Sequence, residues 1–497
     1  MTERQRIDLA FSLRITGKAQ PARRIMIPKP DRGFRFLSIP TMYDRALQAL
    51  FVMALEPEFE AIFEENSYGS RPGRNAIDAM KQIQLCCQQA EKFVLKADIE
   101  KCFDKINHDK LLEILGHKDK IRKQIEAWLK SGNIFEGVFE TSERGIPQGG
   151  VISPLLSNIA LHGLEKVLRD WAENQKLLRP NGKPIDKKSA KRKAVHFIKY
   201  VDDFVIMHRE LWVIEECQKL VNDFLAERGL ALSKAKTKIV HTRFKFQNNS
   251  AGFEFMGFKI KHFTTKKHSA KNNQGKQVGY RLLIFPTMES RQKHFRSIDK
   301  IIRKYKTAKQ SYIIKKLNPI IIGWVNYFRF SHFLTTTTAS SMEQILYKKL
   351  LYWVKRKLNA NSLAAGYKKF WHKINGRRQF AYKNHACDNI SLALYRKIAK
   401  GYSLVKYQKV KGDVSIYNGD VTYWSKRALT PELQTTKRLK LLQKQKYKCN
   451  ICLKQFLPGD ITEIDHIKPI SEGGSHKLTN LQILHVVCHD YKNSKVK

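Results

Sequence analysis

Residues 195–207 read VHFIKYVDDFVIM, two apolar runs that meet at Asp202 and Asp203. Runs of this length and composition predict two buried β-strands joined by a short turn. A third run, FVLKADI at 93–99, predicts another buried strand that ends by delivering Asp98. We therefore expect three carboxylates at one edge of a sheet.

The two adjacent aspartates need a cation. Neighbouring carboxylates repel, so placing both in an apolar hairpin costs stability unless a positive charge offsets them. Mg²⁺ is the usual ion for hard oxygen ligands. A pair of Mg²⁺ ions ~3.5–4 Å apart can activate a 3′-hydroxyl and stabilise a leaving pyrophosphate. A turn without metal is the alternative for the Asp–Asp pair taken alone.

Further blocks stand in a fixed order around this hairpin. They are IPKPDRGFRFLSIP and the residues after it (27–79), DIEKCFD (98–104), RGIPQGGVISPLLSNIAL (144–161) and FMGF (255–258). Together with YVDD (200–203), this order resembles the reverse transcriptases of group II introns. The resemblance implies an α+β multidomain protein with right-hand polymerase fingers and palm, the palm built on an antiparallel sheet.

The resemblance assigns roles at the catalytic strands. It implies that Asp98, Asp202 and Asp203 hold two Mg²⁺ ions at a polymerase site. It also implies that the ring of Phe103 crowds a 2′-hydroxyl, which would favour deoxynucleotides over ribonucleotides by steric exclusion.

Other residues of the blocks are expected near the nucleotide. Lys29 and Arg35 match finger cations that would neutralise the triphosphate. Gln148, followed by Gly149 and Gly150, would let the backbone approach the primer–template or the nucleotide, because a Cβ would block that approach.

Two departures from the family pattern affect these expectations. Phe36 stands where the family usually has proline, so a fixed φ is lost there. The chain also begins shortly before residue 27, so we expect the family's N-terminal extension, which helps to grip RNA and template, to be missing or shortened. Lys236 and Thr237 lie in a further block and are expected to be structural.

The charge of the chain points to nucleic acid. The 497 residues carry 92 Lys and Arg against 45 Asp and Glu, a net charge of +47. Residues 261–440 alone hold 39 basic and 7 acidic residues. Hydrophobic residues make up 42%, which excludes a disordered chain. No apolar run is long enough for a signal peptide or a membrane span, and eight sparse cysteines predict a reducing compartment.

The basic middle of the chain predicts helices. Residues 287–360 have apolar positions at mixed three- and four-residue spacings, with Lys and Arg between them. NPIIIGWVNYFRF (318–330) and KKLLYWVKRKL (348–358) resemble the maturase-specific, or X, domain. The matching residues are Gly323, Trp324, Tyr327 and Trp353. For the aromatic residues we favour core packing between thumb helices over base stacking, and expect Lys and Arg to contact phosphates.

A weaker match follows. SIYNGDVTYWSKRA (415–428) resembles the segment that contacts DNA in many of these proteins, so Lys426 and Arg427 are candidate phosphate ligands.

The C-terminal tail contains two metal-like pairs. Cys449 and Cys452 form one, and His485 and Cys488 the other, at the spacing of two knuckles that grip one tetrahedral Zn²⁺. A redox pair or a chance spacing is the alternative for the first pair alone.

Between the pairs, EIDHIKPISEGGSHKLTNLQILHVVCHD (463–490) resembles the HNH endonucleases, whose fold is a ββα-metal unit. The resemblance implies that His466 is the general base for water, since its pKa leaves it neutral near working pH. It implies that Asp465 and His489 hold one Mg²⁺ or other divalent cation, and that Asn480 orients the loop or His466. His485 stands where the family mostly has cysteine.

The joined prediction is a group II intron-encoded protein with four parts. These are fingers and palm (1–262), a helical thumb or domain X (281–380), a DNA-binding segment (381–440) and an HNH domain with zinc knuckles (441–497). We expect it to polymerise DNA on RNA, assist splicing and nick target DNA. A splicing-only maturase with a relic polymerase is the alternative, and a polymerase domesticated for host defence or repair is a third reading.

The expected partners follow from this reading. They are intron RNA in a ribonucleoprotein, target double-stranded DNA and deoxynucleoside triphosphates, with no membrane and with homodimerisation left open. The expected compartment is the bacterial cytoplasm, or a chloroplast stroma or mitochondrial matrix if the gene is organellar.

Overall fold

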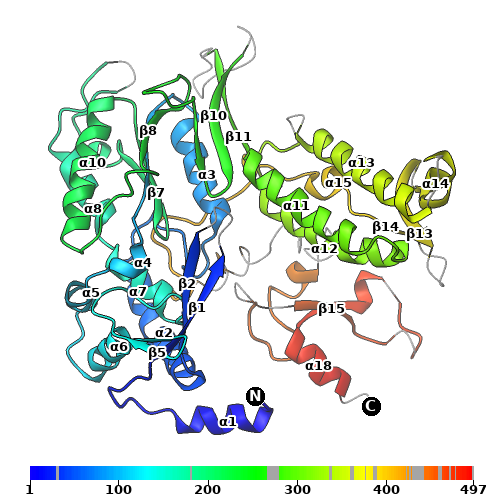
Figure 1. Cartoon of the computed structure of the whole chain (residues 1–497), viewed down its shortest axis with the longest axis horizontal. Helices are drawn as coiled ribbons and strands as arrows, with labels where there is room; N and C mark the ends of the chain where they lie inside the picture. Colours follow the sequence, from blue (N-terminus) through cyan, green and yellow to red (C-terminus); the bar gives the residue numbers. More distant parts are fainter. Residues whose placement is uncertain are drawn as a thin grey trace.

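The computed structural model describes most of the chain. The described residues are 1–28, 33–179, 182–265, 279–334, 338–358, 363–374, 376–383, 389–420, 423–424, 427, 441–456, 460, 462–469, 472–475 and 477–494. Figure 1 shows the N-terminal half as one body, a group of long helices beside it, and the C-terminal unit below those helices.

The centre of the N-terminal body is a four-stranded antiparallel sheet in the order β6-β7-β3-β8. Its strands are β3 (Phe93–Asp98), β6 (His196–Tyr200), β7 (Asp203–His208) and β8 (Lys238–His241). The predicted strands at 93–99 and 195–207 are confirmed. Both faces of the sheet are buried, which explains why these strands are almost continuously apolar. Leu95 and Phe204 face one hydrophobic core, and Val94 and Val205 face the other.

Helices cover the two faces. Helix α10 (Leu211–Ala226) packs on β3 and β7, and α3 (Ala76–Cys87) packs on β6. The other helices of this body are α2 (Met42–Ile62), α4 (Cys102–Lys105), α5 (His108–Leu115), α6 (Lys120–Lys130), α7 (Ser153–Ala160), α8 (Leu164–Glu173) and α9 (Lys188–Arg192). The short α9 has no buried residue.

A second four-stranded sheet, in the order β2-β1-β4-β5, forms the fingers. Its strands are β1 (Ala22–Pro28), β2 (Phe34–Ile39), β4 (Asn133–Phe135) and β5 (Val138–Glu140). Helix α1 (Glu3–Ser12) precedes them and lies along the bottom edge in Figure 1.

A three-stranded sheet joins the palm to the thumb. It consists of β9 (Phe253–Phe255), β10 (Phe258–Thr264) and β11 (Tyr280–Pro286). Because β10 and β11 pair along their whole length, the predicted boundary between 262 and 281 divides one hairpin. The second predicted boundary, at 380, lies inside β13 (Arg377–Lys383).

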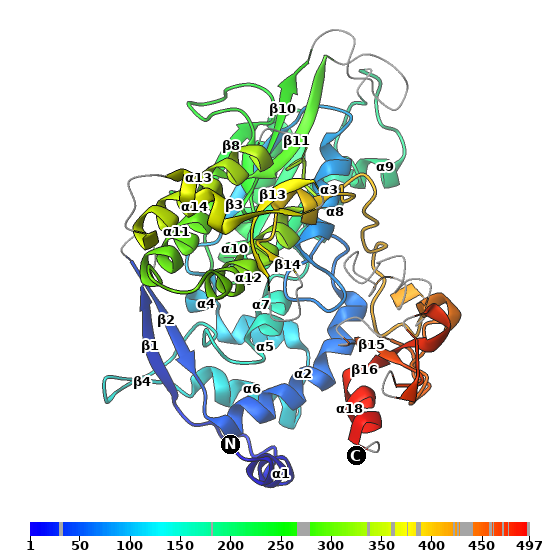
Figure 2. The ribbon, with the colours of Figure 1, turned by 90° about the vertical axis from the view of Figure 1, so that its right-hand side faces the viewer.

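The predicted helical thumb is present. Its helices are α11 (Met288–Lys304), α12 (Gln310–Phe328), α13 (Thr338–Leu358) and α14 (Leu363–Phe370), which surround one apolar core. The small sheet of β12 (Trp371–Ile374), β13 and β14 (Asn389–Ser391) and the short α15 (Tyr395–Ala399) close its far end. Figure 2 shows this group from its own side. Among the described residues, no helix is both long and apolar enough to cross a bilayer.

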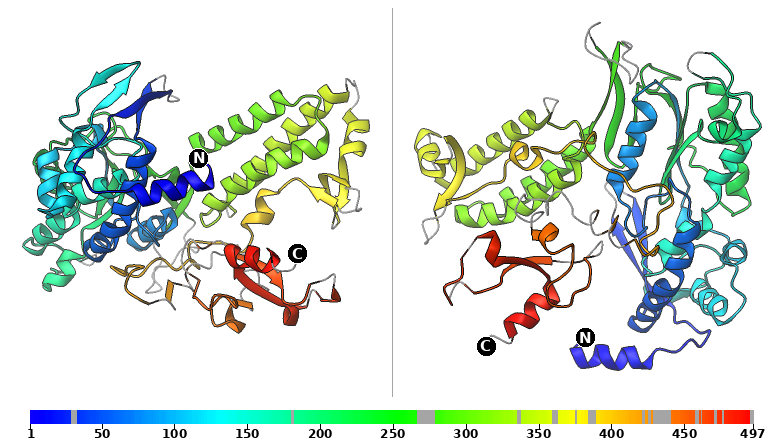
Figure 3. Two further views of the ribbon diagram at one scale, coloured as in Figure 1. Left: turned by 90° about the horizontal axis from the view of Figure 1, so that it is seen from below. Right: turned by 180° about the vertical axis from the view of Figure 1, so that it is seen from behind.

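Residues 402–420 run across the back of the N-terminal body (Figure 3, right), and the described residues between 402 and 427 include no strand. We call residues 402–427 the strap; residues 402–420, 423, 424 and 427 of it are described. The C-terminal unit follows, with β15 (Thr462–His466), the 3₁₀ turn η2 (Leu478–Asn480), β16 (Leu481–His485) and α18 (Val486–Ser494). Its ββα order is that expected of an HNH unit, and the α+β multidomain prediction is confirmed.

Candidate polymerase and nuclease sites

The three predicted aspartates share one end of the palm sheet. Asp98 is the last residue of β3 and is paired in register with Asp203, the first residue of β7. Asp202 lies in the turn between β6 and β7, directly after Val201, which has a positive φ of 59°. The turn thereby places two carboxylates beside a third at the end of the strands, as the sequence predicted.

Burial makes the carboxyl groups of Asp202 and Asp203 hard to ionise. It raises the pKa of Asp203 to about 6, with Lys96 opposing the shift and Asp98 adding to it. Burial also raises the pKa of Asp202, and the charge of Asp98 adds to this while the charge of Arg35 opposes it. A divalent cation would offset both the burial and the repulsion, so the donor set fits the Mg²⁺ that the sequence predicted.

One of the three carboxylates, that of Asp98, forms an ion pair with a lysine. Lys236 Nζ lies 3.0 Å from Oδ2 of Asp98, and this hydrogen bond raises the pKa of the lysine. Sequence reasoning expected Lys236 to be structural. Lys236 lies between other lysines in LSKAKTKI, so the sequence does not indicate which acidic residue would pair with it.

The outer side of the catalytic hairpin is held by a segment that the sequence reasoning did not single out. Residues 66–69 run beside β6, with Lys199 N donating to Asn66 O and Tyr68 N donating to Lys199 O, both at 2.9 Å. A Cβ on Gly69 would lie 2.5 Å from Val201 N. Asn66 Nδ2 in turn donates to the buried Glu165 at 2.6 Å.

The expected nucleotide-binding residues come from several elements. Arg35 is an exposed residue of β2 and is close enough for its charge to affect Asp202. Phe103 lies on α4 just after β3, half-buried against the main core. Lys29 lies outside the described residues.

Close packing of the loop on strand β2 requires glycine at position 149. Gly149 has a φ of +129°, and a Cβ there would lie 2.5 Å from Ser38 O, while Gln148 O accepts from Ser38 N at 2.7 Å. This loop therefore packs on strand β2. Its predicted approach to primer–template or nucleotide stays a prediction.

The aromatic residues of the thumb mainly pack. Trp353 is 1% exposed and Trp324 contacts the core of the thumb. Tyr327 stacks on Phe258 of the FMGF turn, and its hydroxyl donates to Met256 O at 3.0 Å. These contacts support core packing, the reading that we favoured, and they fix the thumb to the palm.

The four predicted zinc ligands converge. Donor atoms of Cys449, Cys452, His485 and Cys488 all lie within 4.8 Å of one another. The ligands of a tetrahedral zinc lie roughly 4 Å apart, so this soft donor set fits Zn²⁺. In the part of the chain that the structure describes, no other group of three or more His, Cys, Asp or Glu donor atoms converges in this way.

The nuclease residues surround the end of β15. Asp465 Oδ1 lies 3.7 Å from His489 Nε2, as expected of two ligands to one cation. Burial alone would raise the pKa of Asp465, but hydrogen bonds from Lys492 and Gln482 hold it below its usual range. Glu463, which the sequence reasoning passed over, lies 3.1 Å from His489 Nδ1.

His466 ends the same strand, paired with Leu481. Asn480 holds the following loop: its side chain accepts from Lys468 N and donates to Lys468 O, both at 2.9 Å. Of the two predicted tasks of Asn480, these contacts support orientation of the loop.

The two candidate DNA contacts differ in outcome. Lys426 lies outside the described residues. Arg427 is described, and its Nη2 makes an ion pair with both carboxylate oxygens of the buried Asp78, at 2.5 and 2.6 Å.

Three family models match the chain in the order of these sites. Residues 27–260 match the reverse transcriptase (RNA-dependent DNA polymerase) family, 291–371 the group II intron maturase-specific domain, and 449–495 the HNH endonuclease family. The chain is a group II intron-encoded protein. The palm, thumb and ββα unit of the structure are its reverse transcriptase, maturase and HNH domains.

Several curated proteins are similar in sequence to parts of this chain. Protein YkfC of Escherichia coli (strain K12) is 32% identical over 48% of this chain and 66% of its own length. The group II intron-encoded protein LtrA of Lactococcus lactis is 28% identical over 54% of this chain and 52% of its own length. Nuclear intron maturase 1, mitochondrial, of Arabidopsis thaliana is 33% identical over 17% of this chain and 12% of its own length. The chain thus spans about half to two thirds of the first two relatives.

Proposed function

We propose that this group II intron-encoded protein is an RNA-directed DNA polymerase that also assists splicing of its intron RNA and nicks target DNA. In this proposal the RNA–protein complex reverse-splices into double-stranded DNA, the HNH domain nicks the opposite strand, and the freed 3′-OH primes cDNA synthesis. The observation that carries the proposal is the pairing of Asp98 with Asp203, beside Asp202, at the edge of the palm sheet.

The residues of the palm edge would perform the polymerase chemistry together with two Mg²⁺ ions. When bound, the ions lower the barrier for attack by the primer 3′-hydroxyl and stabilise the pyrophosphate. Asp98, Asp202 and Asp203 would hold them, Arg35 with Lys29 would neutralise the triphosphate, and Phe103 would exclude a 2′-hydroxyl.

The nuclease would use a separate set. Asp465 and His489 would hold one divalent cation, Mg²⁺ or another, at the scissile phosphate, and His466 would accept the proton of the attacking water. Zn²⁺ at Cys449, Cys452, His485 and Cys488 would hold the ββα unit together without taking part in the chemistry. The proposed compartment is a bacterial cytoplasm or, for an organellar gene, the chloroplast stroma or mitochondrial matrix, and homodimerisation stays a prediction.

The test of the polymerase is a double substitution, Asp202→Ala with Asp203→Ala. We expect it to abolish extension of a DNA primer on an RNA template with Mg²⁺ while the stimulation of intron splicing stays largely intact, because splicing needs RNA binding and not the palm carboxylates. Extension that survives in the double variant would show that the polymerase site is wrongly assigned.

The test of the nuclease is His466→Ala. We expect nicking of the second strand to disappear while bound zinc, measured by metal analysis, stays at the wild-type ratio. Nicking by the purified variant would remove His466 from the role of base. The relic-polymerase alternative predicts no extension by the wild-type protein, and the retention of all three aspartates at one end of the palm sheet argues against it.

A further inference from the structure

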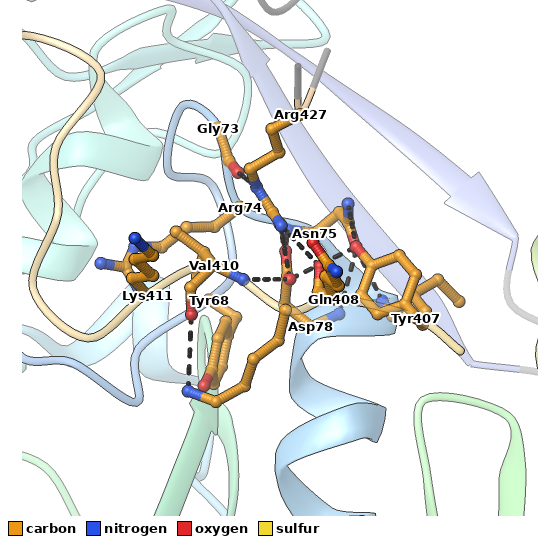
Figure 4. A network of polar contacts seen from close by, with 12 residues as sticks. Tyr68, Gly73, Arg74, Asn75, Asp78, Tyr407, Gln408, Val410, Lys411 and Arg427 are labelled. Carbon is orange, nitrogen blue, oxygen red and sulfur yellow. Dashed lines mark hydrogen bonds and ion pairs between the residues drawn. The ribbon is translucent and has the colours of Figure 1, made fainter. Parts of the chain in front are cut away.

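The strap is bound to a carboxylate inside the polymerase body. Asp78 is fully buried near the start of α3, where its Oδ2 accepts from Asn75 N at 3.0 Å and completes the cap of that helix. From the strap, Arg427 contacts both oxygens of the same carboxylate, and Val410 N donates to Oδ1 at 2.9 Å. Figure 4 shows how these groups from distant parts of the sequence meet on Asp78.

A second contact lies beside the first. The ring of Trp424 is 1% exposed and covers Gly73, where a Cβ would lie 2.5 Å from the ring. Gly73 also has a φ of +71°, so two independent features require glycine there. Next to it, Arg74 donates to Gly412 O of the strap at 2.8 Å.

Each guanidinium nitrogen of Arg427 already donates a hydrogen bond within the protein, so the side chain is poorly placed to bind a phosphate. Its Nη2 is bonded to Asp78, its Nη1 donates to Gln408 O at 2.8 Å and its Nε donates to Gly73 O at 3.4 Å. The side chain is 13% exposed. By contrast, Lys406 of the same strap is exposed to solvent.

The loop that the strap grips is the loop that holds the catalytic hairpin. Residues 66–69 are bonded to Lys199 and packed on Val201, one residue before Asp202. Residues 73, 74 and 78, a few positions later, receive Trp424, Gly412 and Arg427. The guanidinium of Arg74 also lies over the ring of the buried Tyr68, at 5.9 Å. One short stretch thus connects the strap to the catalytic turn.

We propose that Arg427 and Asp78 are positioning residues of the polymerase, which act through residues 66–75 to hold the turn that carries Asp202. In this proposal the strap stabilises the catalytic turn of the palm, in addition to connecting the thumb to the C-terminal unit. This inference rests on the proposed polymerase function. Its physical reason is that removing Arg427 leaves the buried Asp78 carboxylate without the guanidinium that neutralises its charge, so the loop must open to admit water.

The experiment compares three full-length variants with the wild type. Arg427→Ala removes the pair. Arg427→Lys keeps the charge but loses the guanidinium nitrogens that donate to Gln408 O and Gly73 O. Lys406→Ala removes an exposed charge from the same strap. The measurements are kcat and KM for deoxynucleotides in primer extension, and hydrogen exchange of amides in residues 66–70 and 197–203.

We expect Arg427→Ala to lower kcat about tenfold and to speed hydrogen exchange in both stretches, whereas Lys406→Ala leaves both unchanged. Arg427→Lys should fall between Arg427→Ala and the wild type. If Arg427→Ala and Lys406→Ala both keep wild-type kcat and exchange, and differ from wild type only in salt-dependent DNA binding, the strap is a phosphate contact alone and the inference is wrong.

A second, more conservative variant keeps the proposal testable if Arg427→Ala does not fold correctly. Asp78→Asn keeps the shape of the acceptor, and in combination with Arg427→Ala its effect on kcat should be less than the product of the single effects, because both remove one interaction. Multiplicative effects would overturn the inference. If the wild-type chain extends no primer, the proposed function fails, and hydrogen exchange of the hairpin still decides whether the strap holds it.

Discussion

Asp98 and Asp203 face each other across β3 and β7 as a directly paired position of the antiparallel sheet. Each strand is buried on both faces, so the two carboxylates occur at the one point where the strands leave the core. Acids opposite one another on a sheet destabilise it. The palm therefore carries a built-in cost that only a cation at this edge can offset.

The first prediction concerns that cost. Burial raises the pKa of Asp203 from 3.8 to about 6, so the folded chain binds this proton more tightly than the unfolded chain, and stability falls as the pH rises through this range. In EDTA at pH 8, Asp203→Asn should raise the free energy of unfolding by up to about 3 kcal/mol. At pH 4 the gain should nearly vanish because the wild-type carboxyl is then neutral.

Urea unfolding at the two pH values measures this gain, with Asp8→Asn on the exposed α1 as the control that should change neither value. The same Asp203→Asn substitution should abolish primer extension. A variant less stable than the wild type at pH 8 would show that the edge is not under electrostatic strain.

The second prediction concerns Lys236, whose ammonium lies 3.0 Å from Asp98 Oδ2 and would compete with a metal ion for that carboxylate. An exposed ion pair contributes about 0.2–1 kcal/mol, so Lys236→Gln should lower the Mg²⁺ concentration for half-maximal binding by up to roughly fivefold. Calorimetric titration of the free protein with Mg²⁺ measures it. Lys234→Gln, which removes a neighbouring exposed charge, should leave the midpoint in place. Equal shifts in both variants would mean a general charge effect.

The third prediction tests the backbone contact behind the catalytic turn. A methyl group on Gly69 would meet Val201 N at 2.5 Å, so Gly69→Ala should displace the turn, lower the free energy of unfolding by about 1–3 kcal/mol and reduce primer extension at least tenfold. Gly323→Ala is the matched control, because a Cβ there lies in open space on α12. It should keep activity and gain about 0.5–1 kcal/mol of stability.

Local sequence patterns predicted the strands, the helices and the clustered site residues correctly. The apolar runs around Asp98, Asp202 and Asp203 identified the strands and their ends, because burial and strand ends leave local patterns. The Cys and His spacing likewise predicted that Cys449, Cys452, His485 and Cys488 lie together, because metal-ligating pairs also leave a local pattern. The thumb helices followed from three- and four-residue periodicity, and residues such as Ile298 and Ile302 are buried as that pattern requires.

Contacts between distant segments left no such pattern. Arg427 looked like a phosphate ligand because it sits among basic and aromatic residues, yet its partner Asp78 is 349 positions away. Lys236 and Asp98 are likewise 138 positions apart. The predicted boundary at 262 followed the charge composition and the one at 380 the extent of the matching segments, whereas β-pairing carries the sheets across both positions.

The fourth prediction separates the zinc site from the polymerase. Residues including Leu441, Phe456 and Ile483 form a small core of their own around Cys449, apart from the cores of palm and thumb. Such a small core depends on its metal. Cys449→Ser should therefore release zinc and abolish nicking, while primer extension by the same preparation stays within about twofold of the wild type. His485→Cys replaces one of the four ligands by another that zinc accepts, and should retain both zinc and nicking, since tetrahedral zinc accepts Cys₄ as well as Cys₃His. Metal analysis and the two activity assays give the result, and loss of primer extension in Cys449→Ser would show that the palm depends on the zinc-bound unit.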